Sequence, residues 1–173
     1  MDEPSPNVGQ RNEVSVSCRP LVSAEISLAA SLVEAEWGHT YAQRFITEAT
    51  DLLHRAFSSP FGAFDSLGSI RGVGIIVKGD IDYALWGIAW LVVSPSHRGL
   101  GIGEALIRAM TRYATDNQRE FPSPYAVIQL TTRVPEYFLR LGFVEAAKWG
   151  DGGSSRLMIL DTRNAKGVGH ETH

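Results

Sequence analysis

The sequence is poor in cysteine, in long apolar runs and in excess positive charge, and each shortage excludes a class of protein. Cys18 is the single cysteine among 173 residues, which excludes a disulfide framework and a cysteine-rich zinc site. No uncharged apolar run approaches the ~18 residues that cross a bilayer, and the polar start of the chain lacks the apolar segment of a secretory signal. A net charge of −3 argues against a nucleic-acid surface. We therefore expect a cytoplasmic protein with no metal, no membrane partner and no nucleic-acid partner.

What the chain does contain is ordinary for one globular domain. Its hydrophobic fraction is 44% and its charged fraction 20%, which supplies enough apolar material for a single core. Apolar periodicity is confined to residues 13–161, which we expect to form the domain. Residues 1–12 are expected to be a loose arm, and residues 162–173 a flexible polar tail.

Apolar spacing and turn residues together predict an α/β protein. Ser23 is placed to cap the first helix, and Thr40 with Gln43 has the spacing of a capping box at the start of the second. Period-two runs separated by glycine and aspartate predict strands. The pattern predicts helices over residues 23–38, 40–56, 103–117 and 135–141, and strands over residues 14–18, 61–64, 70–77, 85–93, 126–131 and 157–160.

A glycine-rich turn between a strand and a helix is the clearest chemical signal. Gly99, Gly101 and Gly103 alternate along LVVSPSHRGLGIGEALI, residues 91–107. Glycines let the backbone curl around phosphate oxygens, and the helix that follows offers unpaired N–H groups and a positive dipole end. The segment therefore predicts a pyrophosphate site, with a merely tight strand-to-helix turn as the alternative.

Two common phosphate loops do not fit this segment. A Walker A loop needs lysine and then serine or threonine after its last glycine, where this chain has Glu104 and Ala105. A dinucleotide fingerprint counted from Gly99 places Glu104 at its third glycine. What remains is Arg98-x-x-Gly101-x-Gly103.

This remaining pattern resembles the pyrophosphate loop of the GCN5-related N-acetyltransferases (GNAT), which is Arg/Gln-x-x-Gly-x-Gly/Ala. The resemblance extends to Leu141-Gly142-Phe143, where that family has Leu-Gly-Phe after its last short helix. It implies a twisted, mixed, mostly antiparallel sheet flanked by helices and splayed at an acetyl-CoA wedge. It also implies acetyl-CoA as the acetyl donor.

The resemblance further assigns roles by position. The backbone of residues 91–93 would bind the pantetheine arm, with the Val93 amide facing the thioester carbonyl. The amides of residues 98–103 would hold the pyrophosphate, and strand 126–131 would diverge from strand 85–93. The implied acetyl-CoA-binding residues are Leu91, Val92, Val93, Arg98, Gly99, Leu100, Gly101, Ile102, Gly103, Thr131 and Phe138.

A second, local resemblance concerns the acceptor. LTTRVPEYFLRLGF, residues 130–143, is similar to a stretch of the acetyltransferase domain of N-acetylglutamate synthases, which suggests an amino-acid-like acceptor. The alternative for Thr131, Thr132 and Arg133 is a strand end followed by a helix cap.

The chain departs from the family where proton transfer is concerned. Many relatives have a tyrosine at the position of Phe138, and a step along a helix would turn the neighbouring Tyr137 away from the site. Strand 85–93 contains no carboxylate, so the catalytic residues stay unassigned. Trp86 and Trp90 on this strand would line an acceptor pocket or simply pack. A carboxylate from elsewhere would be the alternative base, with Glu36, Asp80 and Asp82 as candidates.

The expected function is therefore transfer of acetyl from acetyl-CoA to a primary amine of a small acceptor. Two alternatives stay open. One is an acetyl-CoA-binding or regulatory module without turnover, and the other is acetylation of a protein N-terminus or lysine. A homo-oligomer is compatible with the sequence.

Overall fold

One seven-stranded sheet organises the protein. The computed structural model describes residues 15–163 except residue 81. Along the sheet the strands follow the order β1-β2-β3-β4-β5-β7-β6, and every neighbouring pair is antiparallel except β4 and β5. The predicted mixed, mostly antiparallel α/β fold is confirmed. The strands are β1 Ser17–Pro20, β2 Ser59–Phe64, β3 Ile70–Lys78, β4 Leu85–Val93, β5 Val127–Thr132, β6 Val144–Trp149 and β7 Ser155–Asp161.

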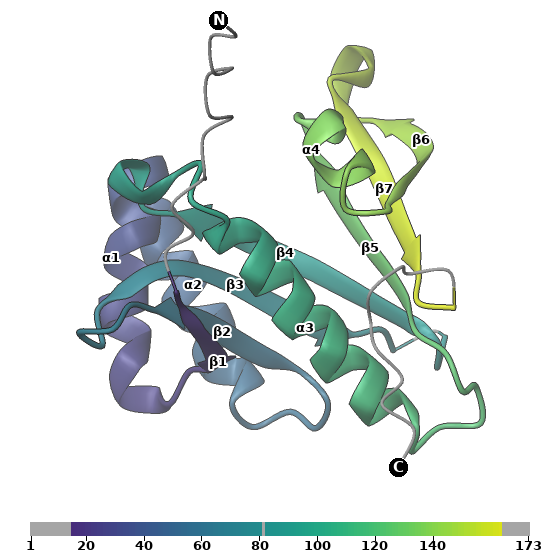
Figure 1. Ribbon diagram of the computed structural model, residues 1–173, viewed down its shortest axis with the longest axis horizontal. Coiled ribbons are helices and arrows are strands. Elements are labelled where there is room, and N and C mark those ends of the chain that lie inside the picture. The colour runs from purple at the N-terminus through teal and green to yellow at the C-terminus, as the bar shows by residue number, and fades with distance from the viewer. Residues whose placement is uncertain (1–14, 81, 164–173) are drawn as a thin grey trace, which may run out of the picture.

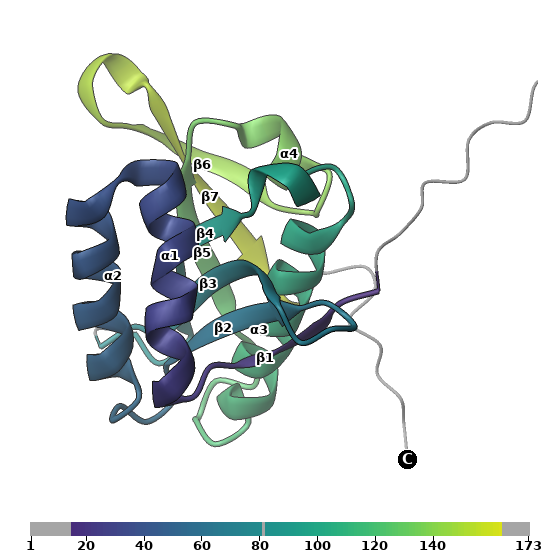
Figure 2. The same ribbon diagram turned by 90° about the vertical axis from the view of Figure 1, so that its left-hand side faces the viewer.

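Helices cover both faces of this sheet. The antiparallel pair α1 (Ile26–Trp37) and α2 (His39–Leu52) lies on one face, and α3 (Ile102–Gln118) runs along the other (Figures 1 and 2). A short helix, α4 (Pro135–Leu139), follows β5 and belongs to the arm formed by β5, β6 and β7. Three short 3₁₀ turns complete the described structure: Ser23–Glu25, Pro95–His97 and Asp151–Gly153.

The two helical layers bury separate apolar clusters. On the α1/α2 face, Phe45 packs with Val73, Ile75 and Val92 of the sheet. On the α3 face, Leu106 and Met110 pack with the other sides of the strands. This helix approaches closely because β3 presents glycines to it: a Cβ on Gly72 or Gly74 would lie 2.9 Å from Leu106 or Met110. An alanine at either position would require the end of the Leu106 or Met110 side chain to move.

A β-bulge interrupts β4. Ala89 pairs with Ile75 and Val92 pairs with Val73, so three steps along β4 oppose two steps along β3. Before the bulge, Trp86 and Ile88 face α3; after it, Trp90 packs with the α1/α2 cluster and Leu91 with the α3 cluster. Trp90 has a φ of 55°, a left-handed conformation that is unfavourable for a residue with a Cβ. The extra residue therefore turns the Trp90 ring to the opposite face of the sheet.

Several predicted element ends are wrong. No side chain caps either N-terminal helix: Val22 precedes the 3₁₀ turn in place of Ser23, and Gly38 precedes α2 in place of Thr40. The Val22 N–H instead donates to the Glu25 carboxylate at 3.0 Å. Strand β1 begins three residues after the predicted start, and β6 was not predicted. Its described side chains, residues 144–148, are all exposed, so this edge strand carries no apolar alternation.

The predicted arm, residues 1–12, lies outside the described residues, as does most of the predicted tail. Of that tail the structure describes Thr162, which exchanges hydrogen bonds with Ala126, and Arg163, which pairs with Asp161. No helix among the described residues has both the length and the apolar character needed to span a bilayer.

Candidate functional site

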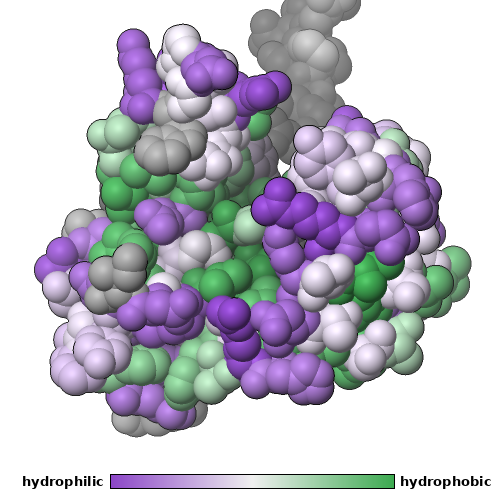
Figure 3. All heavy atoms as spheres, turned by 180° about the vertical axis from the view of Figure 1, so that it is seen from behind, coloured by the Kyte–Doolittle hydropathy of each residue, from purple (hydrophilic) through white to green (hydrophobic). Residues whose placement is uncertain are grey.

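The sheet opens where its single parallel pair of strands separates. Strands β4 and β5 pair only from Leu85 with Val127 to Gly87 with Gln129, and beyond these residues they diverge. Figure 1 shows the resulting V between β4 and the β5–β7 arm. A pocket of about 830 Å³ occupies the opening, lined by residues of both strands, of the loop after β4 and of α4. From behind, the hollow has an apolar floor and a hydrophilic rim (Figure 3).

The loop after β4 exposes a run of unused backbone donors. Gly99 and Gly101 have φ of 77° and 81°, and Gly101 is the left-handed residue that precedes α3. A Cβ built on either glycine would meet no protein atom within 4 Å. Within the described residues, no hydrogen-bond partner is found for the backbone N–H groups of residues 99–104. Because α3 begins here, its dipole adds positive potential, and the loop has the chemistry of an anion site.

Arg98 ties this loop to its surroundings. Its N–H donates to the Pro95 carbonyl at 3.4 Å, so the free run of amides starts one residue later than predicted. Its guanidinium forms an ion pair with Glu36 at the end of α1 and lies 3.3 Å from the Val93 carbonyl oxygen. The charge of Arg98 is thereby held at the rim of the pocket, next to the free amides.

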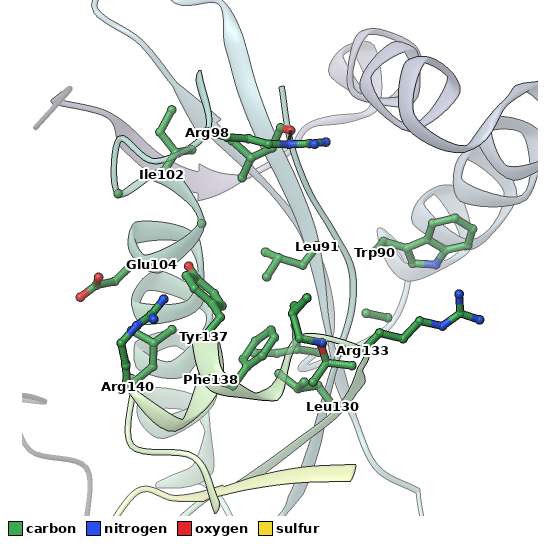
Figure 4. A pocket seen from close by; sticks show the side chains of 18 of the residues that line it. Trp90, Leu91, Arg98, Ile102, Glu104, Leu130, Arg133, Tyr137, Phe138 and Arg140 are labelled. Carbon is green, nitrogen blue, oxygen red and sulfur yellow. Dashed lines mark hydrogen bonds between the residues drawn. The ribbon is translucent and has the colours of Figure 1, made fainter. Parts of the chain in front are cut away.

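All of the predicted binding residues line the pocket except Val92 and Leu100. Val92 faces the α1/α2 cluster, because alternation along β4 points Leu91 and Val93 toward the α3 side. Thr131 and Phe138 line the opposite wall, on β5 and α4. The side chains of Leu91 and Phe138 both point into the pocket in the close-up (Figure 4).

Tyr137 contradicts the expectation that it points away from the site. It lines the pocket beside Phe138, and its hydroxyl lies 2.9 Å from where a Cβ on Gly103 would be. Helix α4 is only one and a half turns long and crosses the wall of the pocket, so neighbouring side chains on it both reach the opening. Burial, with a smaller contribution from Glu104, raises the pKa of Tyr137 to about 12. This phenol is therefore a proton-bearing group at physiological pH.

The two tryptophans of β4 lie in different environments. Trp86 does not line the pocket: it is fully buried, and its Nε1–H donates to the Gln118 side chain at 2.8 Å. Trp90 does line the pocket, together with Trp37 at the end of α1, which was not anticipated. The cause is the bulge, which turns one tryptophan of the strand into the opening and leaves the other in the core.

None of the three carboxylates considered as a base lines the pocket. Glu36 is paired with Arg98, while Asp82 accepts the Ala84 N–H at 2.7 Å in the turn before β4, at the end opposite the opening. Asp80 lies in the same turn. The single pocket-lining carboxylate among the described residues is Glu104, which pairs with Arg108 at 2.7 Å.

Metal and thiol chemistry find no support in the side chains present. In the described part of the chain, no three histidine, cysteine, aspartate or glutamate residues are grouped as metal ligands. Cys18 is half-buried on β1, three strands away from β4, and burial raises the pKa of its thiol, which disfavours the thiolate.

Sequence and structure comparisons agree on one kind of domain. Residues 61–145 match the family model described as "Acetyltransferase (GNAT) domain". No curated protein sequence matches the chain. Among solved structures, an aminoglycoside 6′-N-acetyltransferase complexed with coenzyme A has a TM-score of 0.68 and 13% identity, over 84% of this chain and 96% of that one.

Two further neighbours have similar scores. A spermidine N-acetyltransferase from Vibrio cholerae has a TM-score of 0.65 and 14% identity, over 84% of this chain and 93% of that one. Ard1 from Thermoplasma volcanium has a TM-score of 0.64 and 17% identity, over 86% of this chain and 98% of that one. At these identities the likeness establishes a common fold.

Proposed function

We propose that the chain is an acyltransferase that uses acetyl-CoA and acetylates the primary amine of a small, amino-acid-like acceptor, because residues 61–145 match the acetyltransferase (GNAT) domain model and the fold is shared with acetyltransferases. The observation that carries the proposal is the opening between β4 and β5, with free backbone donors at one end and aromatic side chains at the other. The amino-acid-like acceptor is suggested by the sequence-based expectation that residues 130–143 resemble N-acetylglutamate synthases.

The residues present fit acetyl-CoA as the donor. The free N–H groups of residues 99–104 match the oxygens of a pyrophosphate, and the open space above Gly99 and Gly101 leaves room for it. Leu91, Val93 and Phe138 give an apolar wall for the pantetheine arm. Residues 91–93 and the loop are thus proposed as the donor site, together with Thr131 on the facing strand.

The chemistry requires little from side chains. The acceptor nitrogen attacks the thioester carbonyl carbon, the C–S bond breaks, and the sulfur leaves as a thiolate that takes up a proton while the nitrogen loses one. A thioester is already activated, and positioning alone contributes on the order of 7–11 kcal/mol. The described pocket therefore supports transfer without a dedicated carboxylate on β4.

Release of the free thiol from acetyl-CoA in the presence of a panel of primary amines tests the proposal. We expect at least one amino-acid-like amine to raise thiol release well above the rate of hydrolysis without acceptor. If acetyl-CoA binds but no amine in the panel is acetylated, the chain is a binding module, and acetyl transfer is the wrong function.

Replacement of Phe138 by tyrosine tests whether the site is an impaired form of the tyrosine-dependent one. Phe138 is 5% exposed and packs against Phe143, with ring centroids 5.6 Å apart. We expect kcat/KM of Phe138→Tyr to stay within about tenfold of the wild type, because an acid off the reaction path gains little. A much larger rise would show that this pocket is built for a tyrosine at that position.

A further inference from the structure

Three aromatic side chains form a wall on the α1/α2 side of the opening. Trp37, Tyr41 and Trp90, which we call the aromatic wall, have ring centroids 5.8 to 6.5 Å apart. Trp37 and Tyr41 keep 41% and 51% of their surface exposed, although packing normally removes such rings from water. Trp37 and Trp90 line the pocket, so part of this exposed aromatic surface faces the place of the acceptor.

The aromatic wall is not arranged to hold a cation. The Trp90 Nε1–H donates to Glu48 at 2.5 Å, and Glu48 also binds Arg44, whose guanidinium already lies 5.8 Å from the Trp90 ring centroid. The other carboxylates nearby are paired as well, Glu34 with His39 and Glu36 with Arg98. A polyamine entering this side would therefore meet no unpaired carboxylate among the described residues.

Arg133 is the charged group that this side does offer. It follows β5, lines the pocket and is exposed, and no ion pair or hydrogen bond of its side chain is found within the described residues. The other two arginines of the pocket have contacts: Arg98 binds Glu36, and Arg140 lies over the Tyr137 ring. In the close-up, Arg133 extends to the same side as Trp90, opposite α3 (Figure 4).

An unpaired arginine in the same pocket as flat apolar rings has a definite chemical complement. A guanidinium presents a planar fork of donors that matches a carboxylate, and the exposed rings match a flat apolar group. We infer that Arg133 binds the carboxylate of the acceptor and that Trp37 and Trp90 contact its side group, which makes an aromatic amino acid the favoured class. This inference rests on the proposed function and narrows it, since it disfavours polycationic acceptors.

Matched pairs of amines separate the carboxylate from the rest of the acceptor. L-phenylalanine is compared with phenethylamine, and spermidine serves as a polycationic acceptor. For each compound, kcat/KM is calculated from the concentration of the neutral amine. We expect L-phenylalanine to exceed phenethylamine by about 10- to 100-fold, the worth of a charge-assisted hydrogen bond. In Arg133→Gln the ratio should fall to about one, because the loss falls on the member of the pair that carries the carboxylate. Arg112→Gln is the control, because it removes the same charge from an exposed position on α3 outside the pocket.

The aromatic contact has its own variant. Trp37→Leu keeps an apolar side chain at the rim, so we expect it to reduce the advantage of L-phenylalanine over L-alanine and to leave the Arg133-dependent ratio in place. Preference for phenethylamine or spermidine, or an equal loss for both members of the pair in Arg133→Gln, would overturn the inference and leave acetyl transfer standing.

A binding experiment without turnover distinguishes failure of the inference about Arg133 from failure of the proposed acetyl transfer. Tryptophan fluorescence of the CoA-saturated protein is titrated with N-acetyl-L-phenylalanine and with N-acetylphenethylamine. Arg133-dependent preference for the first compound supports the inference even where no amine is acetylated, in which case acetyl transfer is the part that fails. Absence of binding and of acetylation would overturn both.

Discussion

We expect Gly101→Asp to abolish the thermal stabilisation of the protein by acetyl-CoA. At a hundredfold excess over its Kd, the ligand should stabilise the wild type by about 2.7 kcal/mol, or roughly 5–11 °C in Tm for a chain of this size. The new side chain would stand in the open space above the loop, where a phosphate is proposed to lie. Two like charges about 4 Å apart repel by on the order of 4 kcal/mol near a protein surface, which is enough to remove binding at this concentration.

Two further variants separate charge and backbone strain from ligand contact. Gly68→Asp is the matched control, since Gly68 has a φ of 77° and free space around its Cα, but lies in the β2–β3 turn outside the pocket. It should lower Tm in the absence of ligand and keep the full ligand-induced shift. Gly101→Asn has the shape of the aspartate variant without its charge and should retain part of the shift. An undiminished shift in Gly101→Asp would mean that acetyl-CoA binds elsewhere.

The second large effect concerns pH. Only the neutral amine attacks a thioester, and the described pocket has no unpaired carboxylate to deprotonate the acceptor. We expect kcat/KM to rise roughly tenfold per pH unit until the pH reaches the pKa of the acceptor amine. Tyr137 adds no inflection in this range, because burial raises its pKa to about 12 and it stays protonated. Two acceptors whose amine pKa values differ by about two units should give profiles displaced by the same amount.

An inflection that stays near neutrality for both acceptors would contradict this view and require a base from the protein. The structure indicates where to look for it. His97 and Glu104 line the pocket, whereas Asp80 and Asp82 lie at the far end of β4 and Glu36 is paired with Arg98. His97→Ala and Glu104→Gln are therefore the first substitutions to make.

The interior of the fold was predictable because buried strands and helices show characteristic apolar patterns in the sequence. Strand β4 was predicted with its observed ends, and α3 was placed within one residue at both ends, since each carries apolar residues at the spacing of its own geometry. Edge elements show no such pattern. Strand β6 is held by its pairing with β7 across a short turn, and its own exposed side chains show no apolar alternation from which the strand could be predicted.

The donor side of the site could also be predicted, because the loop offers backbone N–H groups and the glycines that allow this conformation are visible in the sequence. The acceptor side depends on three-dimensional neighbours. Trp37 comes from a helix more than fifty residues before Trp90 in the chain, and Tyr137 enters the pocket because α4 is short. A rule of 100° per residue predicted the direction of a helical side chain, but it could not predict how the helix lies across the opening.

The bulge at Trp90 leaves β4 one residue longer than its pairing with β3 requires. Substitutions in β4 change one contact at a time, whereas a change of length acts on the whole strand. Deleting Ala89 would place Trp90 directly after Ile88, so strict alternation would return and Trp90 would pair with Ile75. Trp90 and the residues after it would keep their present faces, and Trp90 would no longer need its left-handed backbone conformation. The acceptor side can therefore absorb the loss of this one residue, because the pairing register on both sides of it stays the same.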